Sequence, residues 1–547
     1  MGVVTPTILN SGKAMDLAFE LVSIDISHEV NRIPRAQLTL LDGSVARQKF
    51  AVSESKFFEP GQEIEIKLRY EGAPNQEKRV FKGIVVSQNI TASVQGSQLI
   101  VELKAKALAL TVNRKNQIYL EKTDDDAIES ILSGSGMKKG KLMRISSVHP
   151  ELVQYYSTDW DFIVSRAEAN GMLVTVDNDT VSLLKVDLSA AAKHIFEYGL
   201  SEIYAFDLEA DMSHQYPEIH SSSWDIKNQK LTTAVKAKDF KLAQGNLQAE
   251  KLVKTVGIQQ QNFNNSVPLS PEENQAWSDA EMFRNRMAFI RGRIAVAGLS
   301  EIALLDVIEL AGMGERFNGK AVVTGIRHRV DQQGWQTDLQ TGLSPMKFAE
   351  QRDIIDVPAA GLVPAVNGLQ LGIVEQFEED PENELRVKIM LPALGEENNK
   401  LWARLTSPDA GAERGFFFRP EVGDEVVVGF FNDDPRQPVI LGAMFGSKNT
   451  APPIMAELSE DNLKKGIVTK SGTILCFIDD AKSSVYIETP EKNKILLDDD
   501  TERIELSDQH GNTITMSADG IEMKSAKDFK IEASGDVEIK GAKVDIK

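Results

Sequence analysis

Near the C-terminus, apolar residues come in pairs two positions apart, separated by polar and turn-forming residues. This spacing places both members of a pair on one face of a strand. Gly511, Gly520 and Gly535 stand between pairs, where turns belong. Successive pairs begin seven to ten residues apart, a short, nearly regular period that indicates a β-solenoid. The pairs are Val485/Ile487, Ile495/Leu497, Ile504/Leu506, Ile514/Met516, Ile521/Met523, Phe529/Ile531, Val537/Ile539 and Val544/Ile546.

A short strand with two inward apolar side chains cannot enclose a core by itself. Three identical chains wound together supply three sides, so that each layer buries one pair from every chain. The outward positions carry both signs of charge, as at Glu488, Lys494 and Arg503. We therefore predict a C-terminal intertwined trimeric β-helix whose core is formed by the paired residues. A single-chain solenoid, or a meander packed on the preceding domain, is the alternative.

Five short strand patterns precede this tail, between linkers rich in Pro and Ala at residues 357–368 and 450–453. Five strands in roughly 80 residues favour a small Greek-key barrel of the OB type. The strands are expected at Gly372–Gln376, Leu385–Met390, Leu401–Thr406, Asp424–Phe431 and Val439–Phe445.

One segment of this barrel resembles a known family. Residues 420–445 read PEVGDEVVVGFFNDDPRQPVILGAMF, which combines P-x-x-G-D-E-V-x-V-x-F with D-P-x-x-P-x-x-x-G. The combination, which includes Gly423, Asp424, Asp434 and Pro435, resembles the OB domain of VgrG proteins and of related contractile phage tail spikes. In that family the OB domain is followed by an intertwined β-helix, which is the order expected here.

A second stretch resembles the same family. The sequence TDWDFIVSRAEANG predicts a helix that begins after Thr158 and stops at Gly171. With its lead-in it resembles the family element Q-Y-x-x-[ST]-x-W-x-F-[IL]-x-R-x-x-E-x-x-G, through Gln154, Tyr155, Trp160, Phe162, Glu168 and Gly171. Core packing is the expected role of these residues. The position of the family's Arg holds Ser165, and Arg166 follows on a different helix face.

The first 360 residues contain two strand-rich stretches, at residues 57–107 and 303–343, that look like repeats of one β domain. Each has a strand, a loop, the motif F-x-G, a Val/Ile-rich strand and an alternating return strand. A helical insert with a capping box at Ser270 and Glu273 separates them, and the helix is expected to run to about Arg291. The predicted fold is mainly β: duplicated β-barrel-type hub domains with helical inserts over 1–360, an OB-fold domain over 361–450, and a linker and triple-stranded β-helix over 451–547.

Charge and composition exclude several classes of protein. The chain has 547 residues and a formal net charge of −20, which argues against a nucleic-acid partner. Its single cysteine, Cys476, excludes an intramolecular disulfide and a cysteine metal cluster. No apolar run approaches ~20 residues and the first residues do not resemble a signal peptide, so we expect synthesis and assembly in the cytoplasm.

Two patterns that resemble catalytic or metal sites lack a residue or a spacing that the chemistry needs. Residues 314–320 fit G-x-x-x-x-G-K, but Ala321 stands where a phosphate loop needs Ser or Thr. His214 and His220 lack the spacing of a metal site. We therefore predict no catalytic residue, cofactor or metal. The alternatives are a spike-associated hydrolase, although only about 40 residues separate the barrel from the first pair, and an OB-type nucleic-acid binder using Phe416–Phe418 and Arg419 as a stacking platform.

The resemblance implies the trimeric hub and spike of a contractile injection machine, either type VI secretion or an extracellular phage-tail-like particle, delivered outside or into a target on contraction. Two similar domains in each of three chains would present six similar units to a sixfold inner tube. The implied partners are this tube, baseplate proteins, a PAAR-type tip protein, effector cargo, and a target membrane that is punctured mechanically. The chain ends in an expected strand, so the tip protein is expected to sit on Val544, Asp545, Ile546 and Lys547.

Overall fold

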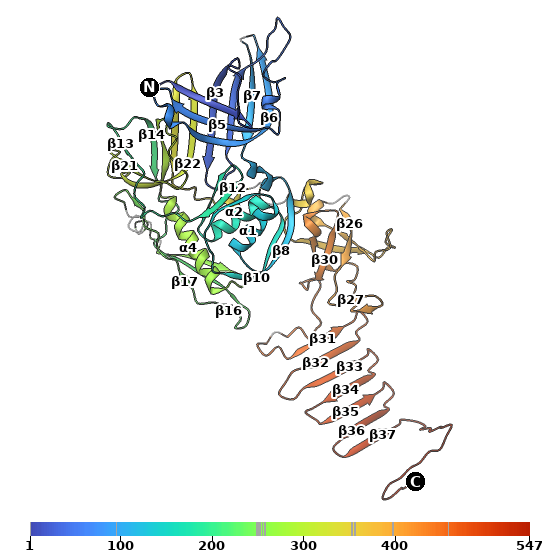
Figure 1. Ribbon diagram of the computed structural model, residues 1–547. Coiled ribbons are helices and arrows are strands. Elements are labelled where there is room, and N and C mark those ends of the chain that lie inside the picture. The colour runs from blue at the N-terminus through green and yellow to red at the C-terminus, as the bar shows by residue number, and fades with distance from the viewer. Residues whose placement is uncertain are drawn as a thin grey trace. The chain divides into compact units, whose positions relative to one another are not determined.

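The computed structural model describes residues 2–94, 96–247, 259–351, 357–395, 399–457 and 459–547, together with 253, 255, 257 and 354. It confirms the predicted mainly β class and divides into two compact units, Met1–Asp356 and Val357–Lys547 (Figure 1). Among these residues, no helix has both the length and the apolar character needed to cross a membrane.

The N-terminal unit is built on one sheet of fourteen strands that contains two five-strand repeats. Within each repeat the strands follow the same path: the first pairs with the second, the second with the fifth, the fifth with the fourth and the fourth with the third. The first repeat is β3 (Leu21–Glu29), β4 (Arg35–Leu41), β5 (Glu63–Tyr70), β6 (Lys78–Ser93) and β7 (Gly96–Lys104). The second is β14 (Ile203–Ala210), β20 (Ile290–Ala297), β21 (Val307–Ala311), β22 (Gly319–Asp331) and β23 (Gly334–Thr341).

The strand registers support the same equivalence. Ile24 pairs with Leu38 in the first repeat, as Phe206 pairs with Ile294 in the second. The fourth and fifth strands share a bulge at one place, between Val85 and Ser87 in the first repeat and between Val323 and Gly325 in the second. The repeats therefore extend beyond the stretches expected from sequence, because β3, β4, β14 and β20 belong to them.

The two repeats are joined edge to edge by β22 and β3, which pair from Gly325–Glu29 to Val330–Ile24. Across this seam the Arg327 guanidinium binds the Asp25 carboxylate, with Nε 2.9 Å from Oδ1. Each repeat has an apolar core, and Val330 and Trp335 of the second repeat pack into the core of the first. The remaining strands of the sheet are β1 (Val4–Asn10), β2 (Lys13–Ala14), β13 (His194–Glu197) and β18 (Ala243–Gln244).

Two histidines lie at this seam, His328 buried and His28 partly buried, and we expect them to make the N-terminal unit sensitive to acid. Burial, with a smaller contribution from neighbouring His28, lowers the pKa of His328 to about 3, and burial also lowers that of His28. Below pH ~6.5 the unfolded chain binds protons that the folded chain does not, so each histidine should cost about 1.4 kcal/mol of stability per pH unit down to its folded pKa. Urea midpoints at pH 7.5 and 5 should show this loss.

The control separates this effect from other titrations. His328→Gln should lower the slope of the unfolding free energy against pH by the contribution of about one proton. His510→Gln, at an exposed turn, should leave it unchanged. Equal slopes for the wild type and His328→Gln would show that His328 does not contribute.

Helices and small sheets fill the inserts between the repeat strands. Thr158 caps α2 (Asp159–Ala169) as expected, since its hydroxyl accepts from the Asp161 amide at 3.0 Å. Ser270 caps α4 (Pro271–Met287), which ends before the expected Arg291 because β20 begins at Ile290. The other elements are α1 (Asp124–Gly134), β8 (Arg114–Thr123), β9 (Lys138–Leu142), β10 (Val148–Thr158), β11 (Leu173–Asp177), β12 (Thr180–Leu184), β15 (Ile219–Asp225), β16 (Lys230–Leu231), β17 (Val235–Lys236) and β19 (Gln261–Asn265).

The C-terminal unit begins with a closed five-strand barrel, which confirms the predicted OB-type fold. Its order around the barrel is β24, β25, β26, β30, β29, and Val374, Ile389, Val426 and Ile440 lie in its core. The strands are β24 (Gln370–Gln376), β25 (Val387–Met390), β26 (Lys400–Leu405), β29 (Glu425–Phe430) and β30 (Pro438–Ala443), with a small hairpin of β27 (Ala410–Gly411) and β28 (Arg414–Gly415).

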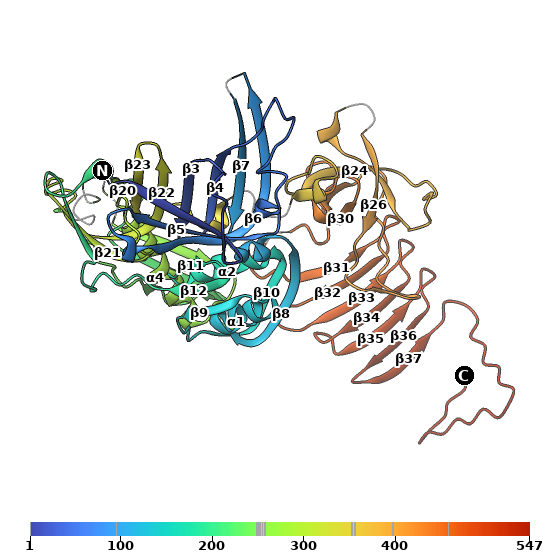
Figure 2. The same cartoon turned by 45° about the horizontal axis from the view of Figure 1, so that its top comes forward.

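Seven antiparallel strands follow the barrel and pair strictly in chain order, so that they stack like rungs (Figures 1 and 2). Each has five residues. They are β31 (Lys464–Val468), β32 (Ile474–Ile478), β33 (Ser484–Glu488), β34 (Lys494–Asp498), β35 (Arg503–Ser507), β36 (Thr513–Ser517) and β37 (Gly520–Lys524).

Candidate functional site

One face of the seven-stranded sheet carries two parallel ladders of apolar side chains, which we call the apolar face. Cross-strand register places the second and fourth residues of each strand in line with those of its neighbours, because side chains two apart share a face. One ladder is Phe477, Val485, Leu497, Ile504, Met516 and Ile521; the other is Ile467, Leu475, Ile487, Ile495, Leu506, Ile514 and Met523.

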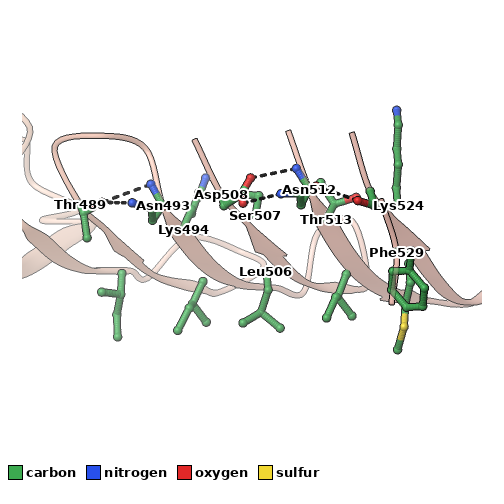
Figure 3. A pocket seen from close by; sticks show the side chains of 15 residues that line it. Thr489, Asn493, Lys494, Leu506, Ser507, Asp508, Asn512, Thr513, Lys524 and Phe529 are labelled. Carbon is green, nitrogen blue, oxygen red and sulfur yellow. Dashed lines mark hydrogen bonds between the residues drawn. The ribbon is translucent and has the colours of Figure 1, made fainter. Parts of the chain in front are cut away.

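The apolar face is open in a single chain. Ile495, Leu497 and Leu506 are 41%, 47% and 41% exposed, whereas Ile389 and Ile440 of the barrel core are fully buried. A groove of about 570 Å³ follows the second ladder. In Figure 3, Leu506 points to one side of the strands, while the polar residues Asn493 and Asn512 lie in the turns at the strand ends. An exposed apolar patch of this length marks an interaction surface.

The sixteen residues predicted as a trimer core divide into two groups in the structure. The first ten, from Val485 to Met523, lie on β33–β37 and on the apolar face. The last six lie outside strands, where strands were expected, and are 52–93% exposed in the single chain. These six residues are Phe529, Ile531, Val537, Ile539, Val544 and Ile546.

The expected strands of this last segment are absent for a physical reason. A strand needs a neighbour to receive its backbone hydrogen bonds, and the segment pairs with none of the described strands. Its apolar side chains also have no opposing surface: Ile531 is 66% exposed and Ile539 is 67% exposed. That Ile531 and Ile539 lie in the core of a trimer stays a prediction, because it concerns three chains together.

The sheet also begins earlier than the sequence indicated. β31 and β32 precede Val485, and they add Ile467, Leu475 and Phe477 to the ladders. The continuous apolar run of β32 conceals the alternation that revealed the later pairs. On the opposite face Cys476 is fully buried, so it lies away from solvent, as expected for a structural cysteine.

Three turns at the same end of the strands share one geometry. In residues 469–473, 489–493 and 508–512 the first side chain accepts from the backbone amide of the fifth residue, at 3.1, 3.2 and 2.9 Å. The fourth residue has a positive φ in each: Gly472 at 90°, Lys492 at 70° and Gly511 at 86°. Only Lys492 carries a side chain where the left-handed conformation favours glycine.

We expect Lys492→Gly to stabilise the C-terminal unit. Relief of the left-handed strain is worth about 1 kcal/mol, and the exposed Lys492–Glu488 ion pair that is lost contributes less than this. The thermal midpoint should therefore rise. The matched change Glu491→Gly, one residue earlier, should lower it, since added backbone freedom is not repaid by relief of strain. A fall with Lys492→Gly would show that this turn is unstrained.

The residues of the family-like helix have structural surroundings. Gln154 is buried and its amide donates to Asp159 at 3.0 Å, while Trp160 and Phe162 lie in the core that surrounds α1 and α2. Glu168 binds Asn31, the Phe348 amide and Arg284, and so joins α2 to three other segments. Gly171 ends the helix at φ 64°. The remaining member, Tyr155, is 82% exposed, so it does not pack in the core as expected.

The barrel motif residues also shape turns. Gly423 has φ 89°, and the Asp424 carboxylate accepts from the Glu421 amide at 2.8 Å. Asp434 binds the Arg436 guanidinium, and Pro435 lies between them. The phosphate-loop-like stretch leads into β22 at Gly319, so no helix N-terminus faces it.

Arg166, which follows the position of the family's Arg, forms an ion pair with the buried Asp124 that the sequence did not indicate. Arg166 reaches Asp124 at the start of α1, with Nε 2.5 Å from Oδ1, and Glu273 at the start of α4 at 3.2 Å. Burial raises the pKa of Asp124, but hydrogen bonds from His149 and Arg166 outweigh it and lower that pKa to about 2. No local pattern signals these partners, because 42 and 107 residues separate them from Arg166.

Comparisons with known proteins match three parts of this architecture. Residues 1–332 match the family described as Alg8 N-terminal domain. Residues 370–445 match the type VI secretion system/phage-baseplate injector OB domain, and residues 484–547 match the phage baseplate V C-terminal trimerisation domain.

The individual relatives share a low sequence identity with this chain. The chain is 22% identical to the type VI secretion system spike protein VgrG1a of Pseudomonas aeruginosa over 78% of its length and 70% of the relative's. It is 22% identical to VgrG1c of the same organism over 73% of its length and 57% of the relative's. A tail protein from Neisseria meningitidis has a TM-score of 0.46 at 14% identity, over 63% of this chain and 98% of that one.

The OB barrel matches an injector OB domain and most of the strand ladder matches a trimerisation domain, which places the chain in the class of injector spike proteins. The chain belongs to the family of the Alg8 N-terminal domain and, with its OB and trimerisation domains, is a VgrG-like spike protein. This confirms the resemblance drawn from the barrel and helix motifs. The hub and spike role follows from the same matches.

Proposed function

We propose that three copies of this chain form the hub and needle of a contractile injection machine, in which the hub matches a sixfold inner tube to a threefold needle. The observation that carries this proposal is the apolar face, which spans the sheet and is open in one chain. Three such faces turned inward give each layer six apolar side chains with no exposure to water. Burial at about 25 cal/mol per Å² over so many side chains favours association strongly.

The outer surface of the needle supports a mechanical role. Residues 454–547 hold 20 acidic and 13 basic side chains, so a trimer carries a large negative charge. Such a surface keeps the needle soluble and discourages side-by-side association. An anionic polar rod gains nothing by entering a membrane, so passage through a target envelope depends on the force that a contracting sheath applies.

The N-terminal sheet supports a ring of six similar units. Within one chain β3 of the first repeat pairs with the distal half of β22 in the second. At the equivalent edges, β14 pairs only with β20 and the distal half of β6 only with β7, so the other side of each has no strand among the described strands. Figure 2 shows β6 and β7 extending past their neighbours. If β14 of each chain pairs with β6 of the next, three chains close a ring with six alike junctions.

The repeat equivalence gives a register for this junction. Ile26 pairs with His328 at the internal seam. Leu208 lies two residues after Phe206, as Ile26 lies two residues after Ile24, so Leu208 is the equivalent of Ile26. Ile90 lies three residues after the bulge residue Ser87, as His328 lies three after Gly325, so Ile90 is the equivalent of His328. Leu208 and Ile90 should therefore face each other across neighbouring chains. Within one chain their strands lie seven positions apart along the sheet, roughly 34 Å at ~4.8 Å per strand.

A double substitution tests this ring. Under mild oxidation, Ile90→Cys with Leu208→Cys should give a covalent three-chain species, because directly opposed residues have the Cα separation that a disulfide needs. Val94→Cys with Leu208→Cys, which places one thiol at the hairpin tip, is the matched control and should not. Either single substitution should give no trimer band. A trimer by mass that never cross-links would contradict the junction while leaving the needle intact.

The tip and the cargo complete the proposal. Val544, Asp545, Ile546 and Lys547 are proposed as the seat of a PAAR-type tip protein, and effectors are proposed to travel on such partners. The apolar members of this stretch are exposed, at 52% for Val544 and 93% for Ile546. Deleting residues 537–547 should abolish tip binding and leave the trimer in place; tip binding that survives the deletion would exclude this seat.

A further inference from the structure

Five aromatic and cationic side chains on the OB barrel form a second exposed surface, which we call the aromatic patch. It consists of Phe377, Phe416, Phe417, Phe418 and Arg419. The four phenylalanines are 47%, 57%, 69% and 59% exposed, whereas Phe58 and Phe81 of the N-terminal unit are 0% and 2% exposed. Aromatic side chains gathered in this way are typical of protein interfaces.

The patch is held in place rather than loosely exposed. The Phe416 amide donates to the Asp409 carbonyl at 2.9 Å, and Ser407 donates to the Phe416 carbonyl. The Arg414–Asp409 ion pair closes the hairpin that precedes it. The Arg419 guanidinium lies between two rings, 5.4 Å from the centre of Phe377 and 5.3 Å from that of Phe417. A surface fixed in this way loses little conformational freedom on binding.

The segment that follows the patch is tied to the C-terminal sheet. Glu421, two residues after Arg419, binds Lys470 at 2.8 Å. Lys470 belongs to the turn between β31 and β32, where the apolar face begins. The chain thus links the aromatic patch to the first two strands of the sheet, and the match to a trimerisation domain begins on the next strand, at residue 484.

We infer that the aromatic patch is a contact with a second copy of this chain, which extends the trimer interface from the needle to the barrels. The inference rests on the proposed trimer. Its threefold axis would bring three patches to one level, where each Phe417 would meet the neighbouring chain. Residues 361–450 hold 15 acidic and 8 basic side chains, so a neighbouring barrel attracts Arg419. The same charge repels a nucleic acid.

Thiol labelling in the full-length protein tests the contact. Cys476 is fully buried and should stay silent. Phe417→Cys should react about tenfold more slowly in the trimer than in the same protein carrying Ile514→Lys, which blocks association, because interface centres exclude water. Glu522→Cys, exposed on the sheet face opposite the apolar face, should react equally in both.

The possible results distinguish the contact at the aromatic patch from the proposed trimer itself. A trimeric mass with Phe417→Cys reacting as fast as in the monomer would overturn the inference alone. A monomeric mass for the unmodified chain would overturn both. Slower labelling caused by a single-stranded oligonucleotide, and reversed by salt, would assign the patch to nucleic acid instead.

Discussion

Ile514→Lys is expected to convert the protein from a trimer to a monomer. Ile514 lies on β36 in the apolar face and lines its groove, with Leu506 and Met523 opposite it on the neighbouring strands. In the trimer this substitution would place three unpaired ammonium groups near one axis, and each costs several kcal/mol to remove from water. Sedimentation should give the mass of one chain.

The next residue in the same strand supplies the control. Thr515 faces the opposite side and lies between Glu505 and Glu522 in the register. Thr515→Lys therefore adds the same charge where two carboxylates can pair with it, which is worth about 0.2–1 kcal/mol. It should leave the trimer intact. If both variants remain trimeric, the apolar face is not the interface.

Arg166→Ala is expected to destabilise the N-terminal unit by about 3–5 kcal/mol, since it leaves the carboxylate of Asp124 buried without its cation. Asp124 is 1% exposed, and Arg166 makes two hydrogen bonds to it, at 2.5 and 3.0 Å. The same guanidinium also binds Glu273, so its loss would loosen three helices together. The urea midpoint of the N-terminal unit should fall accordingly.

An exposed arginine on the same cluster provides the comparison. Arg144 binds Asp125 at 3.0 Å, but its side chain is 78% exposed. Arg144→Ala should cost less than about 1 kcal/mol, because water screens a surface pair. If the two substitutions have equal effects, burial does not strengthen the Arg166 pair.

The elements predicted best were those with a local signal. Alternation at two-residue spacing revealed the strands from Val485 to Met523, and turn residues delimited the five strands of the barrel. Capping residues placed the starts of α2 and α4 correctly, because Thr158 and Ser270 act within three residues of themselves.

Pairings between distant residues had no such signal. The seam that joins Asp25 to Arg327 connects residues 302 positions apart, so the edge-to-edge assembly of the repeats could not be inferred from either stretch alone. The F-x-G motif that suggested the duplication is not strictly equivalent in the two repeats. Gly83 precedes its bulge residue Val85 by two positions, whereas Gly319 precedes Val323 by four. The bulge and the strand order carry the equivalence instead.

The segment after β37 has the residue spacing of strands but forms none in a single chain. Phe529 and Ile531 have the spacing of a strand, as do Val537 and Ile539, yet neither pair forms one. One chain offers them neither an edge nor an opposing face. Residues 484–547 together match a trimerisation domain, which extends over this segment. We therefore expect these residues to form strands against neighbouring chains.

The central claim, that the apolar face is covered by two further copies of this chain, is tested most directly by the mass of the purified full-length protein in solution. Sedimentation equilibrium should give three times the 60.4 kDa of one chain across a wide range of concentrations. A mass of 60.4 kDa at all concentrations would contradict the trimer, the ring and the needle together.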